Sequence, residues 1–218
     1  MAPPRSDVTV LFDLDGTLID SVRGDFLACS ALFAEHGGEL PAQRWAEEVC
    51  GRPDGYAELL AELPGAVDDR FARLRELWAE HMNPGVVVLL PAVLELLAAL
   101  ESAGVAMALV SASDREWVRR WLVHYDLARF FRATVSGDEV ANRKPAPDLY
   151  LEAVRRSGAD PGRCLAVEDS VTGVLAARAA GIAVAAVPTE LTRGLDYSAA
   201  DHVLDRIDGV GALLGLPA

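Results

Sequence analysis

The apolar residues of this chain fall into two alternating patterns: short continuous runs, and longer segments in which they recur at helical spacing. Continuous runs of strand length occur at 8–12, 105–110, 133–136, 164–168, 183–187 and 202–204. Runs that are apolar on both faces are typical of parallel strands covered by helices on both sides. Helical spacing follows these runs at 92–104, 114–127, 147–158 and 170–181. This alternation predicts an α/β fold with a doubly wound, Rossmann-like parallel sheet.

Residues 21–84 interrupt this alternation with a different pattern. Helical stretches follow one another at 24–38, 42–51, 55–65 and 68–82, with no convincing strand between them. The pattern predicts a helical cap domain over 21–84. The α/β core would then consist of 1–20 and 85–218.

Composition excludes several classes of partner. The formal net charge of -13 argues against nucleic-acid binding, which requires clustered basic residues. The N-terminus lacks an apolar stretch of signal-peptide length, and the apolar region 86–110 contains Pro91, Glu95, Glu101 and Gly104, which a membrane span would not carry. Three widely spaced cysteines without a CxxC pattern are typical of reduced thiols. We therefore expect a cytoplasmic monomer or homodimer without nucleic-acid or membrane partners.

Polar residues follow several of the apolar runs at the point where each run ends. Asp13 and Asp15 follow the first run, Ser111 follows the second, and Glu168 and Asp169 close the run at 164–168. The carboxyl ends of parallel strands lie at one edge of a sheet, so these residues should converge. Converging carboxylates repel one another, and Mg²⁺ is a cation that such oxygen ligands satisfy. The sequence therefore predicts a magnesium site at this edge.

A phosphate group is the natural ligand of such a site. Lys144, in RKPAPDLY, precedes the helical segment that leads to the run at 164–168. Its ammonium group and the Ser111 hydroxyl can bind phosphate as a point charge and a hydrogen-bond donor. Taken alone, Ser111 would equally suit a helix cap before 114–127, and Ser113 or Asp114 could take that place instead.

The chain contains four motifs in the order FDLDGTLIDS, ALVSAS, RKPAPDLY and VEDSVTGVLAARAAG. With an insertion of cap length after the first motif, the chain resembles the haloacid dehalogenase-like hydrolases. The resemblance covers nearly the whole chain and is closest to the phosphatase branch with a small helical cap, which includes sugar phosphatases and β-phosphoglucomutase.

The resemblance implies a role for each motif residue. Asp13 matches the nucleophile that forms an aspartyl-phosphate, and Asp15 matches the general acid and base. Asp13 would bind Mg²⁺ by its side chain and Asp15 by its backbone carbonyl. Asp169 would be a direct metal ligand, whereas Glu168 would act through water. The phosphate-binding set is Gly16, Ser111, Ala112 and Lys144.

Substrate choice is expected to come from the cap. In related sugar-phosphate enzymes a GR-like turn points at the active site, and CGRPDGY places Arg52 there. Asp25, Asp54 and Tyr56 are further polar cap residues. An exposed arginine in a surface turn is the alternative interpretation of Arg52. Trp117 and Trp121, on one face of a helical segment, are expected to pack helices.

The favoured function is that of a Mg²⁺-dependent phosphoric monoester hydrolase acting on a small phosphorylated metabolite, a sugar or polyol phosphate. A phosphotransferase similar to β-phosphoglucomutase is the alternative, but Asp25 stands about where such mutases carry a histidine. A dehalogenase would lack Asp15, and a phosphonate hydrolase would need a cap lysine, whereas Lys144 is the one lysine of the chain. A non-catalytic metabolite-binding protein of the same fold is a remote alternative, since every catalytic position is filled.

Overall fold

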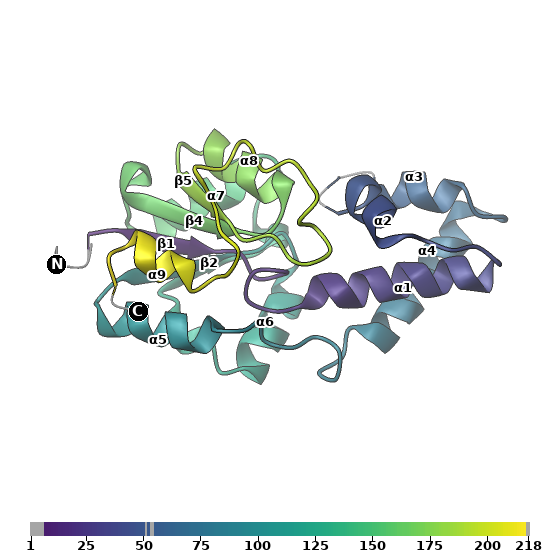
Figure 1. The fold of residues 1–218 in the computed structure, drawn as a ribbon, viewed down its shortest axis with the longest axis horizontal. Coiled ribbons are helices and arrows are strands. Elements are labelled where there is room, and N and C mark those ends of the chain that lie inside the picture. The colour runs from purple at the N-terminus through teal and green to yellow at the C-terminus, as the bar shows by residue number, and fades with distance from the viewer. Residues whose placement is uncertain (1–6, 51, 53–54, 217–218) are drawn as a thin grey trace.

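A parallel sheet forms the centre of the protein. The computed structural model describes residues 7–50, 52 and 55–216. In this part of the chain the sheet has the order β3-β2-β1-β4-β5-β6, in which chain order reverses at β1 (Figure 1). The strands are β1 (Thr9–Phe12), β2 (Ala106–Val110), β3 (Ala133–Val135), β4 (Cys164–Glu168), β5 (Ala183–Ala186) and β6 (His202–Val203). The predicted doubly wound sheet is confirmed, and each predicted strand is present to within two residues.

Helices cover both faces of the sheet, which explains the continuous apolar strands. Along β1, Val10 and Phe12 pack into the core on one face, and Leu11 packs into the core on the other. The first face is covered by α5 (Val93–Ser102), α6 (Arg115–His124) and the short α9 (Gly209–Leu213). The second face is covered by α7 (Asp148–Ser157) and α8 (Val171–Ala179). Short 3₁₀ turns occur at Ala128–Phe130, Gly137–Glu139 and Pro161–Arg163.

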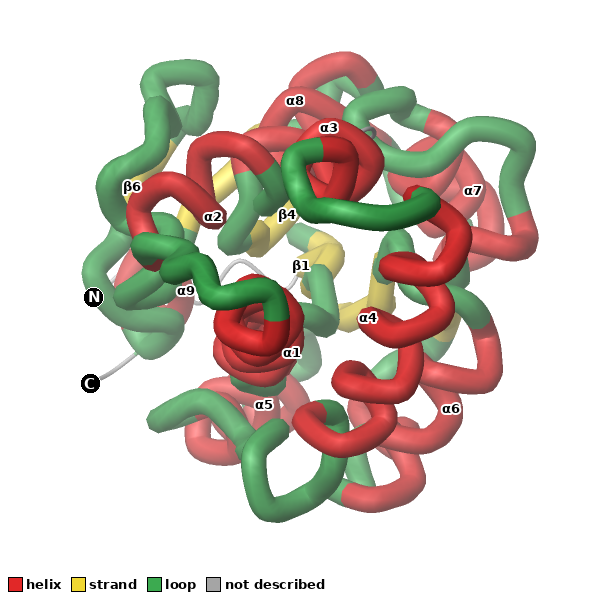
Figure 2. Tube along the Cα trace, turned by 90° about the vertical axis from the view of Figure 1, so that its right-hand side faces the viewer, coloured by secondary structure: helices red, strands yellow, loops and turns green. Residues whose placement is uncertain are grey.

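The helices that the structure describes between β1 and the return to the sheet form a separate layer. They are α1 (Ser21–Glu35), α2 (Ala42–Glu48), α3 (Gly55–Ala61) and α4 (Val67–His81). Their apolar faces meet in a hydrophobic cluster that includes Leu32, Trp45, Leu59 and Leu74. Figure 2 shows this helical layer in front of the carboxyl edge of the sheet. We call these helices the cap; the domain bounds 21–84 stay a prediction.

The two crossings between core and cap lie side by side. The Asp20 amide donates to the Val88 carbonyl at 2.8 Å, and the Leu90 amide donates to the Leu18 carbonyl at 3.0 Å. Asp20 also caps α1, because its side chain accepts from the Arg23 amide at 3.3 Å. The cap is thus connected to the core by a short pair of hydrogen-bonded segments at the sheet edge that carries the predicted site. None of the described helices combines the length and apolar character that crossing a membrane requires.

Candidate active site

The ends of three neighbouring strands bring the predicted acidic residues together. Asp13 follows β1, Ser111 follows β2, and Glu168 and Asp169 lie at the end of β4. Because β2, β1 and β4 are adjacent in the sheet, these positions meet at one edge. Carboxylate oxygens of Asp13, Glu168 and Asp169 lie within 4.8 Å of one another, and all three residues are buried.

One lysine bridges two of these carboxylates. The Lys144 Nζ lies 2.5 Å from Asp13 Oδ1 and 2.6 Å from Glu168 Oε1, and it donates to the Val110 carbonyl at 3.1 Å. Lys144 therefore reaches from the segment before α7 to the ends of β1, β2 and β4. Its three contacts match the three hydrogens of an ammonium group, so its position is fully determined.

The site holds more negative charge than its lysine balances. Burial raises the pKa of Asp13 well above its usual range, Lys144 lowers it, and Glu168 raises it further. Burial likewise raises the pKa of Asp169, and so does the charge of Asp13. For Lys144, burial disfavours the charged form, but the neighbouring Asp13 and Glu168 carboxylates raise its pKa above the ordinary value. Three buried carboxylates and one ammonium group create a demand for a further cation.

A divalent cation fits the residues that are present. The three carboxylates are the hard oxygen donors that Mg²⁺ prefers. Gly16 has a positive φ of 80°, and a Cβ atom there would lie 2.0 Å from Asp169 Oδ2. The missing side chain therefore leaves room for the Asp169 carboxylate beside the turn that carries Asp13. Asp13 and Asp169 would hold the ion.

Glu168 is held from several sides and belongs to the support of the site. It is fully buried and accepts hydrogen bonds from the Tyr150 hydroxyl and, at 3.3 Å, from the Ser170 hydroxyl, in addition to its ion pair with Lys144. Tyr150 was not predicted from the sequence. The only signal for it is a phenolic hydroxyl on the apolar face of the segment 147–158, because a buried hydroxyl needs a partner.

The space for the Glu168 side chain depends on Gly173 in α8. An added Cβ there would lie 1.9 Å from Glu168 Oε2. Helix propensity alone predicts that Gly173→Ala stabilises the protein by about 1 kcal/mol. We expect the opposite, a loss of about 1–3 kcal/mol, because the clash displaces a carboxylate fixed by three partners. Thermal unfolding tests this, with Gly194→Ala as the control, since a Cβ at Gly194 meets nothing within 4 Å. Unchanged or increased stability of Gly173→Ala would refute the packing argument.

Asp15 accepts hydrogen bonds from four side chains. The Ser21 hydroxyl and the Trp117 indole donate to Oδ1 at 2.7 and 2.8 Å. The hydroxyls of Ser113 and Ser111 donate to Oδ2 at 2.8 and 3.3 Å. Four donors from α1, α6 and the loop after β2 fix the carboxylate and occupy about all of its acceptor capacity.

These contacts settle two open points about the segment after β2. Ser111 donates to Asp15 and accepts from the Ser113 amide at 3.0 Å, so it lies beside Asp15 and does not cap α6. The cap of α6 is Asp114, which accepts from the Trp117 amide at 2.9 Å. The packing interpretation holds for Trp121, which is fully buried, but is incomplete for Trp117, whose indole NH reaches Asp15.

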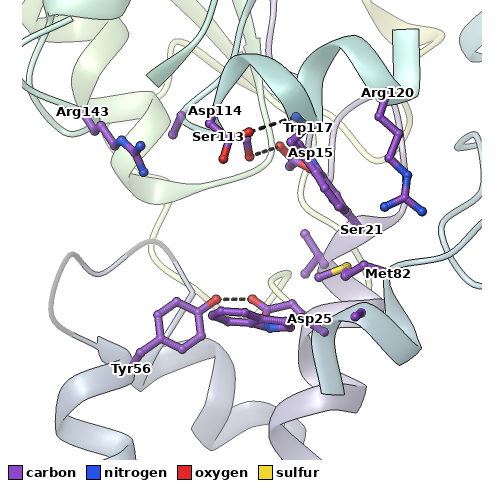
Figure 3. A pocket seen from close by; sticks show the side chains of 14 residues that line it. Asp15, Ser21, Asp25, Tyr56, Met82, Ser113, Asp114, Trp117, Arg120 and Arg143 are labelled. Atoms are coloured by element: carbon purple, nitrogen blue, oxygen red, sulfur yellow. Dashed lines mark hydrogen bonds between the residues drawn. The ribbon is translucent and has the colours of Figure 1, made fainter. Parts of the chain in front are cut away.

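A cavity of about 640 Å³ lies between the core and the cap (Figure 3). Asp15 and Ser113 lie on its core side, and Asp25 and Tyr56 lie opposite them on the cap side. The remaining lining residues are Ser21, Val22, Trp78, Ala79, Met82, Ala112, Asp114, Trp117, Arg120 and Arg143.

The predicted cap residues have different fates. The Arg52 side chain is half-exposed and forms an ion pair with Glu58 at 2.9 Å, and it does not line the cavity in the described structure. Its role in specificity stays a prediction. Asp54 lies outside the described residues. Asp25 and Tyr56 both line the cavity, where the Tyr56 hydroxyl donates to Asp25.

Comparison with known proteins finds relatives over most of the chain. A family model described as haloacid dehalogenase-like hydrolase matches residues 10–187. CbbY of Rhodobacter capsulatus is 34% identical over 204 residues, which cover 88% of this chain and 90% of that protein. A phosphoglycolate phosphatase of Salmonella typhimurium is 30% identical over 245 residues, which cover 95% and 92% of the two chains.

A solved structure is similar over nearly the whole chain. It is a variant of CbbY from Rhodobacter sphaeroides in complex with xylulose-(1,5)bisphosphate. The TM-score is 0.76 at 27% sequence identity, and the match covers 96% of this chain and 99% of that one.

Proposed function

The chain belongs to the haloacid dehalogenase-like hydrolases, and from this premise we propose that it is a Mg²⁺-dependent phosphatase that hydrolyses a small sugar or polyol phosphate through an aspartyl-phosphate. The observation that carries the proposal is the buried group of Asp13, Lys144, Glu168 and Asp169 beside a cavity that Asp15 lines. An anionic nucleophile, a fixed cation and a separate carboxylate for proton transfer are the parts that phosphoryl transfer requires.

In the first half-reaction, an Asp13 carboxylate oxygen attacks phosphorus and the bond from phosphorus to the leaving oxygen breaks. Lys144, 2.5 Å from Asp13 Oδ1, favours the ionised form of the nucleophile and places its positive charge beside the phosphoryl oxygens. Asp15 gives its proton to the leaving oxygen, which departs as the alcohol. The product on the enzyme is an aspartyl-phosphate at Asp13.

In the second half-reaction, Asp15 takes a proton from water, and the oxygen of that water attacks phosphorus. Inorganic phosphate leaves, and the Asp13 carboxylate is restored. For this step one of the four donors to Asp15 gives way to the water, and the Ser111 hydroxyl, the most distant at 3.3 Å, is the one that we expect to move. The Ser111 hydroxyl and the backbone of the Gly16 turn are the groups that we expect to bind phosphoryl oxygens.

Asp13 and Asp169 would hold Mg²⁺, with Glu168 behind them holding Lys144 in place. The bound ion supplies charge neutralisation for the phosphoryl oxygens, worth several kcal/mol in the transition state. Burial of all three carboxylates excludes bulk water from their surroundings, which strengthens each electrostatic contact.

The relatives support a small phosphorylated substrate. One is named a phosphoglycolate phosphatase, and the solved CbbY complex contains a sugar bisphosphate. The cavity of about 640 Å³ is of a size that holds a ligand of this class. A cytoplasmic location, and a monomer or homodimer as the assembly, stay predictions.

The test is phosphate release from sugar, polyol, glycolate and nucleotide monophosphates, with Mg²⁺ and with EDTA. We expect metal-dependent release from a narrow group of sugar or polyol phosphates, with kcat/KM of at least about 10⁴ M⁻¹s⁻¹ for the best of them. β-Glucose 1-phosphate is also assayed for isomerisation. Formation of glucose 6-phosphate without phosphate release would replace the phosphatase by the mutase alternative.

A further inference from the structure

A fixed carboxylate of the cap faces the catalytic side of the cavity. Asp25 of α1 accepts hydrogen bonds from the Tyr56 hydroxyl of α3 and, at 2.7 Å, from the Trp78 indole of α4. The Cys29 thiol is a weaker third donor at 3.7 Å. The rings of Tyr56 and Trp78 meet edge to face, with centroids 5.3 Å apart, which fixes both donors. The position of Asp25 is therefore set by three cap elements.

Asp25 retains acceptor capacity toward the cavity. Trp78 and Cys29 donate to Oδ1, whereas Tyr56 donates to Oδ2. Each carboxylate oxygen has about two acceptor sites, so Oδ2 can accept one more hydrogen bond. The Tyr56 oxygen can also accept, because it spends its own hydrogen on Asp25. Figure 3 shows this pair at the edge of the cavity, across from Asp15.

Asp25 also lacks a cationic partner in the described part of the chain, since its three contacts are neutral donors. The lining of the cavity also includes the apolar side chains of Val22, Ala79 and Met82. An uncompensated carboxylate in such surroundings gains from any further hydrogen-bond donor and is unfavourable next to a second anion.

The other acids of the cavity are already engaged by the protein. Asp15 accepts three hydrogen bonds from the core and one from Ser21 of α1, and Asp114 caps α6. Arg120 and Arg143 lie on the flanks of the cavity, away from the Asp25–Tyr56 pair (Figure 3). On the cap side of the cavity, across from Asp15, the substrate therefore meets two oxygen acceptors, Asp25 Oδ2 and the Tyr56 hydroxyl oxygen.

We infer that Asp25 and Tyr56 determine specificity by accepting a hydrogen bond from the leaving group, so that the substrate carries a hydrogen-bond donor there and not a second acidic group. The inference rests on the proposed phosphatase function and narrows its substrate class. A hydroxyl of a sugar or polyol phosphate, or an ammonium group, supplies such a donor; a carboxylate does not.

A matched series of small esters tests the inference on the Mg²⁺-loaded enzyme. The series is propyl phosphate, glycerol 3-phosphate, phosphoethanolamine and 2-phosphoglycolate, which offer no donor, hydroxyls, an ammonium group and a carboxylate. We expect kcat/KM for glycerol 3-phosphate or phosphoethanolamine to exceed that for propyl phosphate by about 10-fold or more, the effect of one hydrogen bond to a charged group. The better of the two identifies the donor. We expect 2-phosphoglycolate to rank lowest.

Variants assign the preference to these residues. Asp25→Asn and Tyr56→Phe should each reduce the ratio of kcat/KM for the donor ester over propyl phosphate by about 10-fold. A purely structural role in holding the cap together would lower both rates and leave the ratio unchanged. Asp69→Asn, an exposed acid-to-amide change on α4, is the matched control and should leave the ratio as in the wild type.

Three results would overturn the inference: an unchanged ratio in both variants, equal rates for all four esters, or 2-phosphoglycolate as the best substrate. The last of these would move recognition to the flanking arginines. p-Nitrophenyl phosphate separates this failure from failure of the proposed function. If the wild type releases nitrophenol but shows no donor preference, only the specificity inference fails. If it releases none, the phosphatase proposal fails.

Discussion

Asp13→Asn is expected to lower the rate of phosphate release by at least about 10⁴-fold, because an amide cannot attack phosphorus. The amide also removes the anion that faces Lys144 at 2.5 Å. The measurement is kcat on the best ester of the panel and on p-nitrophenyl phosphate, in both cases with saturating Mg²⁺. The loss should be equally large on both, since the nucleophile serves every substrate.

Two further variants make this result specific. Asp13→Ala excludes reversion by deamidation and should be equally inactive. Asp69→Asn makes the same acid-to-amide change at an exposed cap position and should keep wild-type turnover. Mass spectrometry should show that the Asp13→Asn protein contains no aspartate at position 13. If this protein still has a kcat within tenfold of the wild type, Asp13 is not the nucleophile.

The second large effect is expected from loss of the cation. EDTA should lower kcat by about 10³-fold or more, since the ion supplies several kcal/mol of charge stabilisation. Readdition of Mg²⁺ should restore the rate in the wild type but not in Asp169→Asn. Full activity in EDTA, or a normal Mg²⁺ response in Asp169→Asn, would contradict the assignment of the site.

Stability gives a readout of the same site that does not depend on turnover. Burial raises the pKa of Asp13 and of Asp169 in the folded protein, so the folded state binds protons more tightly than the unfolded state. The resulting stability is complete below the unfolded carboxyl pKa of about 4 and is lost as pH rises through the higher folded values. At neutral pH, metal-free protein should therefore be destabilised by its carboxylates, and Mg²⁺ should raise Tm.

Asp169→Asn isolates this contribution from the other titrating groups. Without metal at neutral pH, the variant should melt above the wild type, because one buried charge has been removed. The difference should shrink on acidification, as the wild-type carboxylates take up protons. If the metal-free variant melts below the metal-free wild type at neutral pH, the buried carboxylates do not destabilise the folded protein, and this account of the site is wrong.

Much of the core of this site could be predicted because it depends on local pattern and sheet topology. Parallel strands place the residues that follow them at a common edge, so the convergence of Asp13, Ser111, Glu168 and Asp169 follows from where the apolar runs end. The structure places the carboxylates of Asp13, Glu168 and Asp169 within 4.8 Å of one another. Lys144 could be proposed from the need for a counter-charge, but its contacts with Asp13, Glu168 and Val110 could not, because a lysine before a helix has no local signal of its own.

The support of the site could not be predicted in the same way, because it depends on contacts between helices far apart in sequence. Trp117 has the apolar spacing of a packing residue. Its indole donates to Asp15 because α6 lies against the turn that follows β1, which the sequence pattern does not show. Tyr150 fits an apolar helical face, and its hydroxyl reaches Glu168 only when α7 packs on the sheet. A Tyr or Trp on an apolar helical face can serve only in packing or can also donate a hydrogen bond to the site, and the sequence does not distinguish the two.

The cap shows the same limit more strongly. Its helices follow from the 3.6-residue period, but the cavity surface depends on how α1, α3 and α4 pack against one another. Tyr56 and Trp78 lie 31 and 53 residues after Asp25 in the sequence, yet the three side chains form one hydrogen-bonded group. Arg52 was singled out by its turn motif, whereas the structure pairs it with Glu58.

The most direct test of the account is a search for the covalent intermediate in Asp15→Asn protein. p-Nitrophenyl phosphate has a leaving group that needs no proton, so the first half-reaction should proceed while hydrolysis, which needs Asp15, is blocked. We predict a burst of one nitrophenol per enzyme with Mg²⁺, and mass spectrometry should find one phosphoryl group on the peptide that contains Asp13. Steady release without a burst, or a phosphoryl group on another residue, would contradict nucleophilic catalysis by Asp13.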